Sequence, residues 1–172
     1  MIFVTLGTQD KEFRRLLDAA LKLKTDDKVI IQYGSTKPTE KDLKKLKNKP
    51  NFELHQYISS KDFKKYMKEA DCIVTHAGAG TIISGLKLRK KMVVAARRKE
   101  YKEHVNDHQL QLLNTFYDAG YIMKLDNFDD LSKLIKKDFT PKEFNSNKTK
   151  FNEYLFNEIE LLTSKNKSKK KN

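Results

Sequence analysis

The glycine-rich segment HAGAGT, from His76 to Thr81, has the residue types that bind phosphate groups. An apolar run precedes it and a helical pattern follows it, so its glycines fall between a strand and a helix. Glycine lets the backbone approach a ligand closely, and a helix start offers unpaired N–H groups and a positive dipole end. The segment predicts a diphosphate site at Gly78, Gly80 and Thr81, with His76 as a further donor. A tight turn without a ligand is the competing interpretation, and the spacing matches neither the dinucleotide fingerprint nor the Walker A motif.

A shorter segment of the same type follows the first apolar run, residues 2–6. Gly7 and Thr8 stand where that strand ends, and they predict a second loop that faces the ligand. Thr8 has a simpler alternative role as the N-cap of the following helix, since threonine accepts a backbone N–H bond in that position.

The segment EHVNDHQ, residues 103–109, gathers many hydrogen-bonding side chains at a loop-to-helix junction. A carboxylate accepts hydrogen bonds and an amide both donates and accepts, so Asp107 and Gln109 are candidates to bind sugar hydroxyl groups. The structural alternative is a capping box, with Asn106 as N-cap and Gln109 three residues later. Capping accounts for only part of this polar cluster, so we favour the binding interpretation.

Metal and nucleophile chemistry find little support in the sequence. His104 and His108 are four residues apart, but no HExxH motif or cysteine pair accompanies them. Cys72 is the single cysteine and lies at the start of an apolar run, where a small buried side chain is expected.

Strand and helix patterns alternate through almost the whole chain. This alternation predicts an α/β fold, namely a single Rossmann-like domain with a mainly parallel sheet of five to six strands flanked by helices. Ligands of such sheets bind at the carboxyl ends of the strands, so the glycine-bearing strand ends should share one edge. The expected strands are residues 2–6, 28–32, 52–57, 72–75, 92–96 and 120–125. The expected helices are residues 13–24, 59–67, 81–88, 105–119 and 128–135, and a short polar helix that Thr39 and Asp42 open.

The chain of 172 residues has room for one such domain. We expect the Rossmann-like domain at residues 1–140, a C-terminal helix at 141–163 and a basic tail at 164–172. The net charge is +13, and the tail contributes five lysines without an acid. No secretory signal is recognisable, and no apolar run approaches the roughly 20 residues that span a bilayer. We therefore expect a soluble, cytoplasmic protein.

Four motifs together resemble a known family. In order they are residues 2–8 (IFVTLGT), 31–34 (IQYG), 76–81 (HAGAGT) and 103–109 (EHVNDHQ). They are similar to the C-terminal, nucleotide-sugar-binding domain of the GT-B glycosyltransferases related to the lipid II-forming N-acetylglucosaminyltransferase. Stand-alone versions of that domain look most similar: the catalytic subunit of the dolichol-linked N-acetylglucosaminyltransferase, and subunits of bacterial capsule and exopolysaccharide glycosyltransferases. The resemblance covers about residues 1 to 140.

The resemblance implies half of a GT-B fold and an inverting transfer from a UDP-sugar, with no metal and no other cofactor. The residues that should face the diphosphate are Gly7, Thr8, His76, Gly78, Gly80 and Thr81. Asp107 and Gln109 should face the donor sugar. Related enzymes hold the ribose with a glutamate, and the matching position here is Ser84, which leaves that contact in question.

A GT-B reaction also needs an acceptor-binding domain, and in split members of the family a separate membrane-anchored protein supplies it. The general base then lies in that partner or in this chain, at Glu103 or His104. We predict a UDP-sugar-dependent hexosyltransferase subunit that transfers a sugar to a lipid-linked acceptor in bacterial capsule or exopolysaccharide synthesis. It would act at the inner face of the cell membrane through its partner.

Two alternatives remain open at this point. One is a non-catalytic stabilising subunit of such an enzyme, to which Ser84 gives some support. The other is a basic nucleic-acid-binding module, which the charge of +13 allows. The chain lacks aromatic residues interleaved with arginine, so we expect no nucleic-acid partner.

Overall fold

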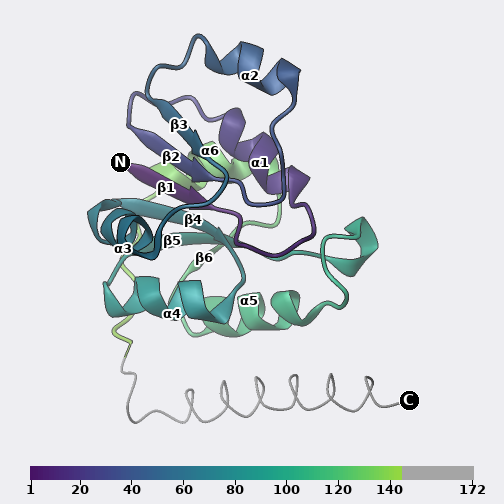
Figure 1. The fold of residues 1–172 in the computed structure, drawn as a ribbon. Coiled ribbons are helices and arrows are strands. Elements are labelled where there is room, and N and C mark those ends of the chain that lie inside the picture. The colour runs from purple at the N-terminus through teal and green to yellow at the C-terminus, as the bar shows by residue number, and fades with distance from the viewer. Residues whose placement is uncertain (145–172) are drawn as a thin grey trace.

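Six parallel strands form one central sheet in the computed structural model, which describes residues 1–144 (Figure 1). Their order across the sheet is β3-β2-β1-β4-β5-β6, and all neighbouring pairs are parallel. This arrangement confirms the predicted Rossmann-like fold. The strands are β1 (Ile2–Thr5), β2 (Val29–Gln32), β3 (Phe52–His55), β4 (Cys72–His76), β5 (Lys91–Ala95) and β6 (Met123–Lys124).

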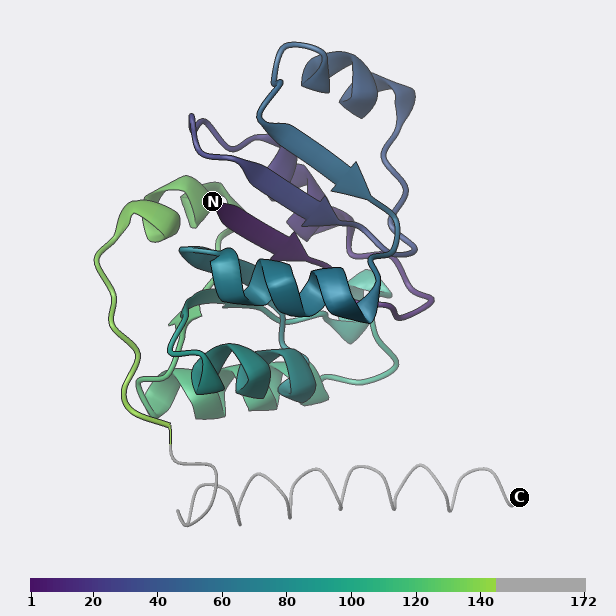
Figure 2. The ribbon, with the colours of Figure 1, turned by 60° about the vertical axis from the view of Figure 1, so that its left-hand side comes forward.

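β1, β2, β4 and β5 are mainly apolar because helices cover both faces of the sheet. Val4 and Phe3 are adjacent and fully buried, and they belong to two separate core clusters. The cluster with Val4 includes side chains of the first and last helices, α1 and α6, whereas the cluster with Phe3 includes side chains of α3, α4 and α5 (Figures 1 and 2).

The helices are α1 (Arg14–Leu21), α2 (Glu40–Leu46), α3 (Ser60–Glu69), α4 (Ala79–Lys87), α5 (His108–Asp118) and α6 (Leu131–Lys136). Two short 3-10 helices are η1 (Lys99–Tyr101) and η2 (Phe128–Asp130).

Local capping signals in the sequence predict two helix starts correctly. The Thr39 hydroxyl accepts from the Asp42 backbone N–H, and the Asp42 carboxylate accepts from the Thr39 backbone N–H, so α2 has the full capping box. Ser59 caps α3 by accepting from the Asp62 backbone N–H.

Two other capping expectations are wrong. Thr8 is not a helix cap, because α1 begins only at Arg14 and the residues between form a loop. Asn106 and Gln109 do not form a capping box either. The N-cap of α5 is Asp107, and the Gln109 side chain accepts instead from the backbone N–H of Arg97.

Elements near the end of the described chain are shorter than predicted. Only Met123–Lys124 of the expected strand 120–125 pairs with β5. Gly120, at φ +76°, turns the chain out of α5, and Tyr121 and Ile122 pack into the core before pairing begins. Residues 141–144 contain no helix, and the rest of the expected C-terminal helix and the basic tail lie outside the described residues. Within residues 1–144, no helix has the length and apolar character that a membrane crossing requires.

The sheet brings the predicted glycine loops together. β1 lies between β2 and β4, so the loops that follow these three strands emerge at one edge. Gly34 follows β2 so closely beside Gly7 that a Cβ atom on Gly34 would collide with the Gly7 carbonyl oxygen. The carboxyl edge at β1 and β4 is therefore the place to look for a ligand site.

Candidate functional site

A cavity of about 900 Å³ opens at this edge and continues between α3 and α4. It lies at the topological switch point, because the chain leaves β1 toward α1 on one face and leaves β4 toward α4 on the other. Seven of the residues predicted to bind the donor line it: Gly7, Thr8, His76, Gly78, Gly80, Thr81 and Ser84. The fold thus brings together residues that lie more than 70 positions apart in the sequence.

Gly7, Gly78 and Gly80 differ in what a side chain at each position would contact. Gly7 has φ +85°, and a Cβ atom there would approach His76 Cε1 to 2.7 Å. A Cβ atom on Gly78 would collide with the other side of the same ring, at Nε2. Gly80, in contrast, has no described atom within 4 Å of the position of a Cβ atom, apart from its chain neighbours and the backbone of its own helix. The protein's own packing explains Gly7 and Gly78 but leaves the space at Gly80 open to a ligand.

Helix α4 begins at the cavity without a side-chain cap. Its N-cap is Gly78, which has no side chain to accept a hydrogen bond. The backbone N–H groups of Ala79, Gly80 and Thr81 have no hydrogen-bond partner among the described residues. Free N–H groups and the positive dipole end therefore lie together at the cavity, which is the usual environment of a bound phosphate.

His76 is neutral at pH 7. Burial lowers the pKa of His76 from 6.5 to about 4, the positive charge of Arg97 lowers it further, and a hydrogen bond with the Thr5 backbone opposes both effects. A neutral imidazole donates through one ring nitrogen only, so an anion could receive that hydrogen bond only in place of the Thr5 backbone. The neutral ring cannot form an ion pair with an anion.

Ser84 forms a local hydrogen bond in the cavity wall. Its hydroxyl donates to the Gly80 carbonyl oxygen at 2.7 Å, one helical turn earlier. At this point of α4 the cavity therefore has a hydroxyl group and no carboxylate.

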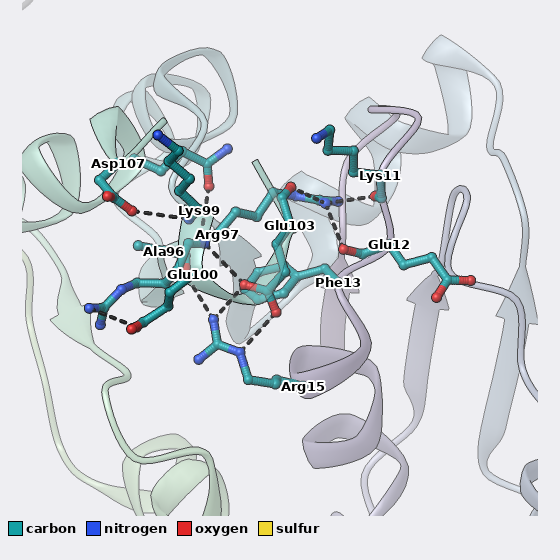
Figure 3. Close-up of polar contacts among 12 residues, drawn as sticks. Lys11, Glu12, Phe13, Arg15, Ala96, Arg97, Lys99, Glu100, Glu103 and Asp107 are labelled. Carbon is teal, nitrogen blue, oxygen red and sulfur yellow. Dashed lines mark hydrogen bonds and ion pairs between the residues drawn. The ribbon is translucent and has the colours of Figure 1, made fainter. Parts of the chain in front are cut away.

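A buried arginine fixes the loop between β1 and α1 (Figure 3). Arg97 is 1% exposed, and its guanidinium donates to the carbonyl oxygens of Leu6 at 2.8 Å and Lys11 at 2.7 Å. It also lies 5.0 Å from the centroid of the Phe13 ring. Burial lowers the pKa of Arg97 to about 10, so the side chain is still charged at pH 7. The loop that carries Gly7 and Thr8 is thus held by charge-assisted bonds from Arg97, which follows β5.

An ion pair between Arg15 and Glu103 holds the loop between β5 and α5. Glu103 is 4% exposed, and its carboxylate accepts from Arg15 Nε at 2.8 Å and from Arg15 Nη2 at 2.5 Å. It also accepts from the Arg98 backbone N–H at 3.0 Å. Arg15 in turn lies 4.1 Å from the Tyr101 ring centroid. Together with Arg97, this pair joins the loops after β1 and β5 into one packed unit.

Comparison with known proteins identifies the family of this chain. A family model described as the glycosyltransferase family 28 C-terminal domain matches residues 1–168. The chain belongs to this family.

Relatives of this family 28 domain include subunits of sugar transferases. The chain is 26% identical over 129 residues to the UDP-N-acetylglucosamine transferase subunit ALG13 of Debaryomyces hansenii, which covers 74% of this chain and 54% of that protein. The subunit of the same name from Candida albicans is 31% identical over 71 residues, which covers 41% of this chain and 23% of that protein. The chain thus spans about half the length of the first relative and less of the second.

Solved structures share the fold at lower identity. An NMR structure of ALG13 has a TM-score of 0.54 and 18% identity, over 81% of this chain and 87% of that one. The crystal structure of Acinetobacter baumannii MurG has a TM-score of 0.55 and 19% identity, over 77% of this chain and 39% of that one. These similarities place the family 28 domain among the halves of GT-B folds.

The predicted residues of segment 103–109 do not line the cavity of the family 28 domain. Asp107 accepts from the Lys99 backbone N–H at 3.1 Å, and Gln109 accepts from the Arg97 backbone N–H at 3.1 Å. Each uses one oxygen atom in this way, and the Gln109 amide nitrogen donates to no described residue. These side chains therefore build the loop and still keep polar atoms that can contact a sugar.

The two candidate bases, Glu103 and His104, differ in the partners that they already have. The Glu103 carboxylate is already bonded to Arg15 and to a backbone N–H group. Burial lowers the pKa of His104, so its imidazole is neutral at pH 7 and can accept a proton. Its Nδ1 atom lies 3.1 Å from the Asn106 carbonyl oxygen. Of the two side chains, only the Glu103 carboxylate is held in an ion pair by a described residue.

Within residues 1–144, no group of three histidine, cysteine or acidic side chains is arranged to hold a metal ion.

No sequence pattern indicates the role of Arg97, which is one of two adjacent arginines in a chain with 36 lysines and arginines. Its position shortly after a buried strand is the one indication that its side chain would be buried.

Proposed function

We propose that the family 28 domain binds a UDP-sugar in the cavity at β1 and β4 and forms the donor half of a split, inverting glycosyltransferase. The open space at Gly80 beside the uncapped start of α4 carries this proposal. A diphosphate fits such a place because it accepts several backbone N–H bonds and interacts favourably with the helix dipole.

The same arrangement suits the chemistry of the transfer. The acceptor hydroxyl attacks the anomeric carbon, the bond from that carbon to the diphosphate oxygen breaks, and UDP leaves with an additional negative charge. Fixed N–H groups at a helix start stabilise charge that develops on a leaving group. A base must take the acceptor's proton, and His104 or a residue of a partner protein would serve.

The sugar would lie toward the loop between β5 and α5, near Asp107 and Gln109. The metal-independent mechanism remains a prediction that rests on the family resemblance. The names of the relatives make UDP-N-acetylglucosamine the first donor to test. We further propose a membrane-anchored partner and a lipid-linked acceptor in bacterial surface-polysaccharide synthesis, because segment 103–109 resembles that of such enzymes.

The test is UDP binding by Gly80→Val, measured by calorimetry. A valine side chain at residue 80 would fill the space that the phosphates need without colliding with the protein, so binding should be lost while the fold is kept. Wild-type protein with UDP at 100 times the dissociation constant should gain roughly 2.7 kcal/mol of unfolding free energy.

Lys87→Val is the matched control, because it places the same side chain on α4 away from the cavity. It should bind UDP like the wild type. Unchanged UDP affinity in a folded Gly80→Val protein would contradict the proposed site.

A further inference from the structure

Two lysines of α3, Lys64 and Lys68, line the cavity one helical turn apart. They lie on the wall that faces α4, which Figure 2 shows next to α3 on the same face of the sheet. Neither lysine forms an ion pair with a described residue. No aspartate or glutamate is among the residues that line the cavity. The cavity therefore has two positive side chains and no negative one.

This charge distribution has a cost that a bound anion would remove. Like charges at positions i and i+4 of a helix repel each other. Asp62, in the first turn of the helix, is bonded to the Ser59 hydroxyl at 2.6 Å and forms no ion pair with either lysine. A concave site with charges of one sign attracts ligands of the opposite sign.

The other two lysines of this helix, Lys61 and Lys65, do not line the cavity. They are also one turn apart, so they carry the same charge on the same element but point elsewhere. The chain thus contains its own control pair.

We propose that Lys64 and Lys68 bind the diphosphate of the donor from the side opposite the start of α4. This rests on the proposed function, since the diphosphate is the charged part of a UDP-sugar whose base and sugar are neutral. The two lysine charges match the two negative charges of a diphosphate diester. The phosphates would then lie between backbone N–H groups on one side and two ammonium groups on the other.

The experiment measures the binding of UDP, uridine and inorganic pyrophosphate to the full chain by calorimetry, at low and high salt. The variants are Lys64→Gln, Lys68→Gln, their double variant and the control double variant Lys61→Gln/Lys65→Gln. Each single change in the cavity should weaken UDP binding roughly tenfold, since a hydrogen bond to a charged group is lost. Uridine affinity should stay unchanged, and the loss for UDP should shrink as salt screens the charges.

The control double variant should bind UDP within about twofold of the wild type, because distant exposed charges are screened. Equal UDP affinity of the two double variants would overturn the proposal, as would an equal loss for uridine. UDP binding that does not depend on Lys64 and Lys68 would overturn this inference and leave the proposed function intact. Lysine-dependent binding of pyrophosphate without UDP binding would contradict the proposed function and still support a diphosphate-binding role of the two lysines. A wild-type protein that binds neither UDP nor pyrophosphate would overturn both proposals.

Discussion

His76 shows at the scale of one residue how the site is prepared for an anion. Gly7 and Gly78 enclose its ring so tightly that neither could carry a side chain, and Arg97 adds a positive charge nearby. The imidazole is therefore held neutral and oriented. A fixed neutral donor beside a helix start can contact a phosphate without a change of protonation when the ligand binds or leaves.

The low pKa of His76 predicts that the protein loses stability in mild acid. The pKa is about 4 in the folded protein and about 6.5 in the unfolded chain, so this contribution is complete above pH 6.5. As the pH falls from 6.5 toward 4, only the unfolded chain takes up the proton, and the unfolding free energy should be about 2 kcal/mol lower at pH 5 than at pH 7.5. Urea unfolding at both pH values measures this difference, and an NMR titration of the ring gives the pKa itself.

His76→Gln is the comparison for this measurement. It removes the titrating group, so its unfolding free energy should change less between the two pH values. The explanation fails if the ring in the folded protein takes up its proton near pH 6.5.

At the scale of elements, the loop between β5 and α5 has two tasks. It packs against the loop after β1 through Arg97, and it presents segment 103–109 at the sheet edge (Figure 3). The sequence predicted that the strand-end glycines would lie together, because the carboxyl ends of parallel strands share one edge of a sheet. It could not predict that Gln109 would hold the Arg97 backbone, since that bond joins residues whose proximity depends on the folded loop.

The role of residues that act through long-range packing could not be predicted from the sequence for the same reason. In the sequence, Lys64 and Lys68 do not differ from other exposed lysines, and only the folded chain shows that they line the cavity between α3 and α4. The sequence predicted a parallel sheet but not the order of its strands. Apolar strands show that helices cover both faces of the sheet, but they do not show which strands are neighbours.

Two substitutions of Gln109 separate the structural task of this loop from sugar binding. Gln109→Ala leaves the buried Arg97 N–H without an acceptor, so the unfolding free energy should fall by about 1–3 kcal/mol. Gln109→Glu keeps an acceptor oxygen and should fold with near wild-type stability, but it loses the amide donor. If the amide binds the donor sugar, Gln109→Glu should weaken UDP-sugar binding roughly fivefold, the equivalent of about 1 kcal/mol, and leave UDP binding unchanged.

Urea unfolding and calorimetry with UDP and UDP-N-acetylglucosamine measure both effects. The sugar-binding role of Gln109 is contradicted if Gln109→Glu binds UDP and the UDP-sugar with the same change relative to the wild type.

At the scale of the whole molecule, the described residues form the cavity of the proposed donor site at one edge of a single sheet. The cavity gathers glycine loops, a free helix start and two lysines, all of which suit a nucleotide diphosphate. The relatives from Debaryomyces hansenii and Candida albicans are named as transferase subunits. A GT-B reaction takes place in the cleft between a donor half and an acceptor half, and this chain supplies the fold of one half.

The last prediction is therefore that this chain alone transfers sugar slowly or not at all, and that a membrane-anchored partner restores turnover. Orientation of two reactants accounts for a large part of enzymatic rate enhancement, and a lone donor domain cannot position an acceptor. The five lysines of residues 163–172, which lie outside the described part of the chain, would assist docking, because basic residues near an anionic membrane contribute about 1 kcal/mol each.

The assay follows sugar transfer to a lipid-linked acceptor by the purified chain, with and without membranes that contain the partner. Gly80→Val with the same membranes is the control and should give no transfer, because its donor site is filled. Full turnover by the purified wild-type chain without membranes would contradict the split-enzyme reading, whereas turnover that appears only with the partner would support it.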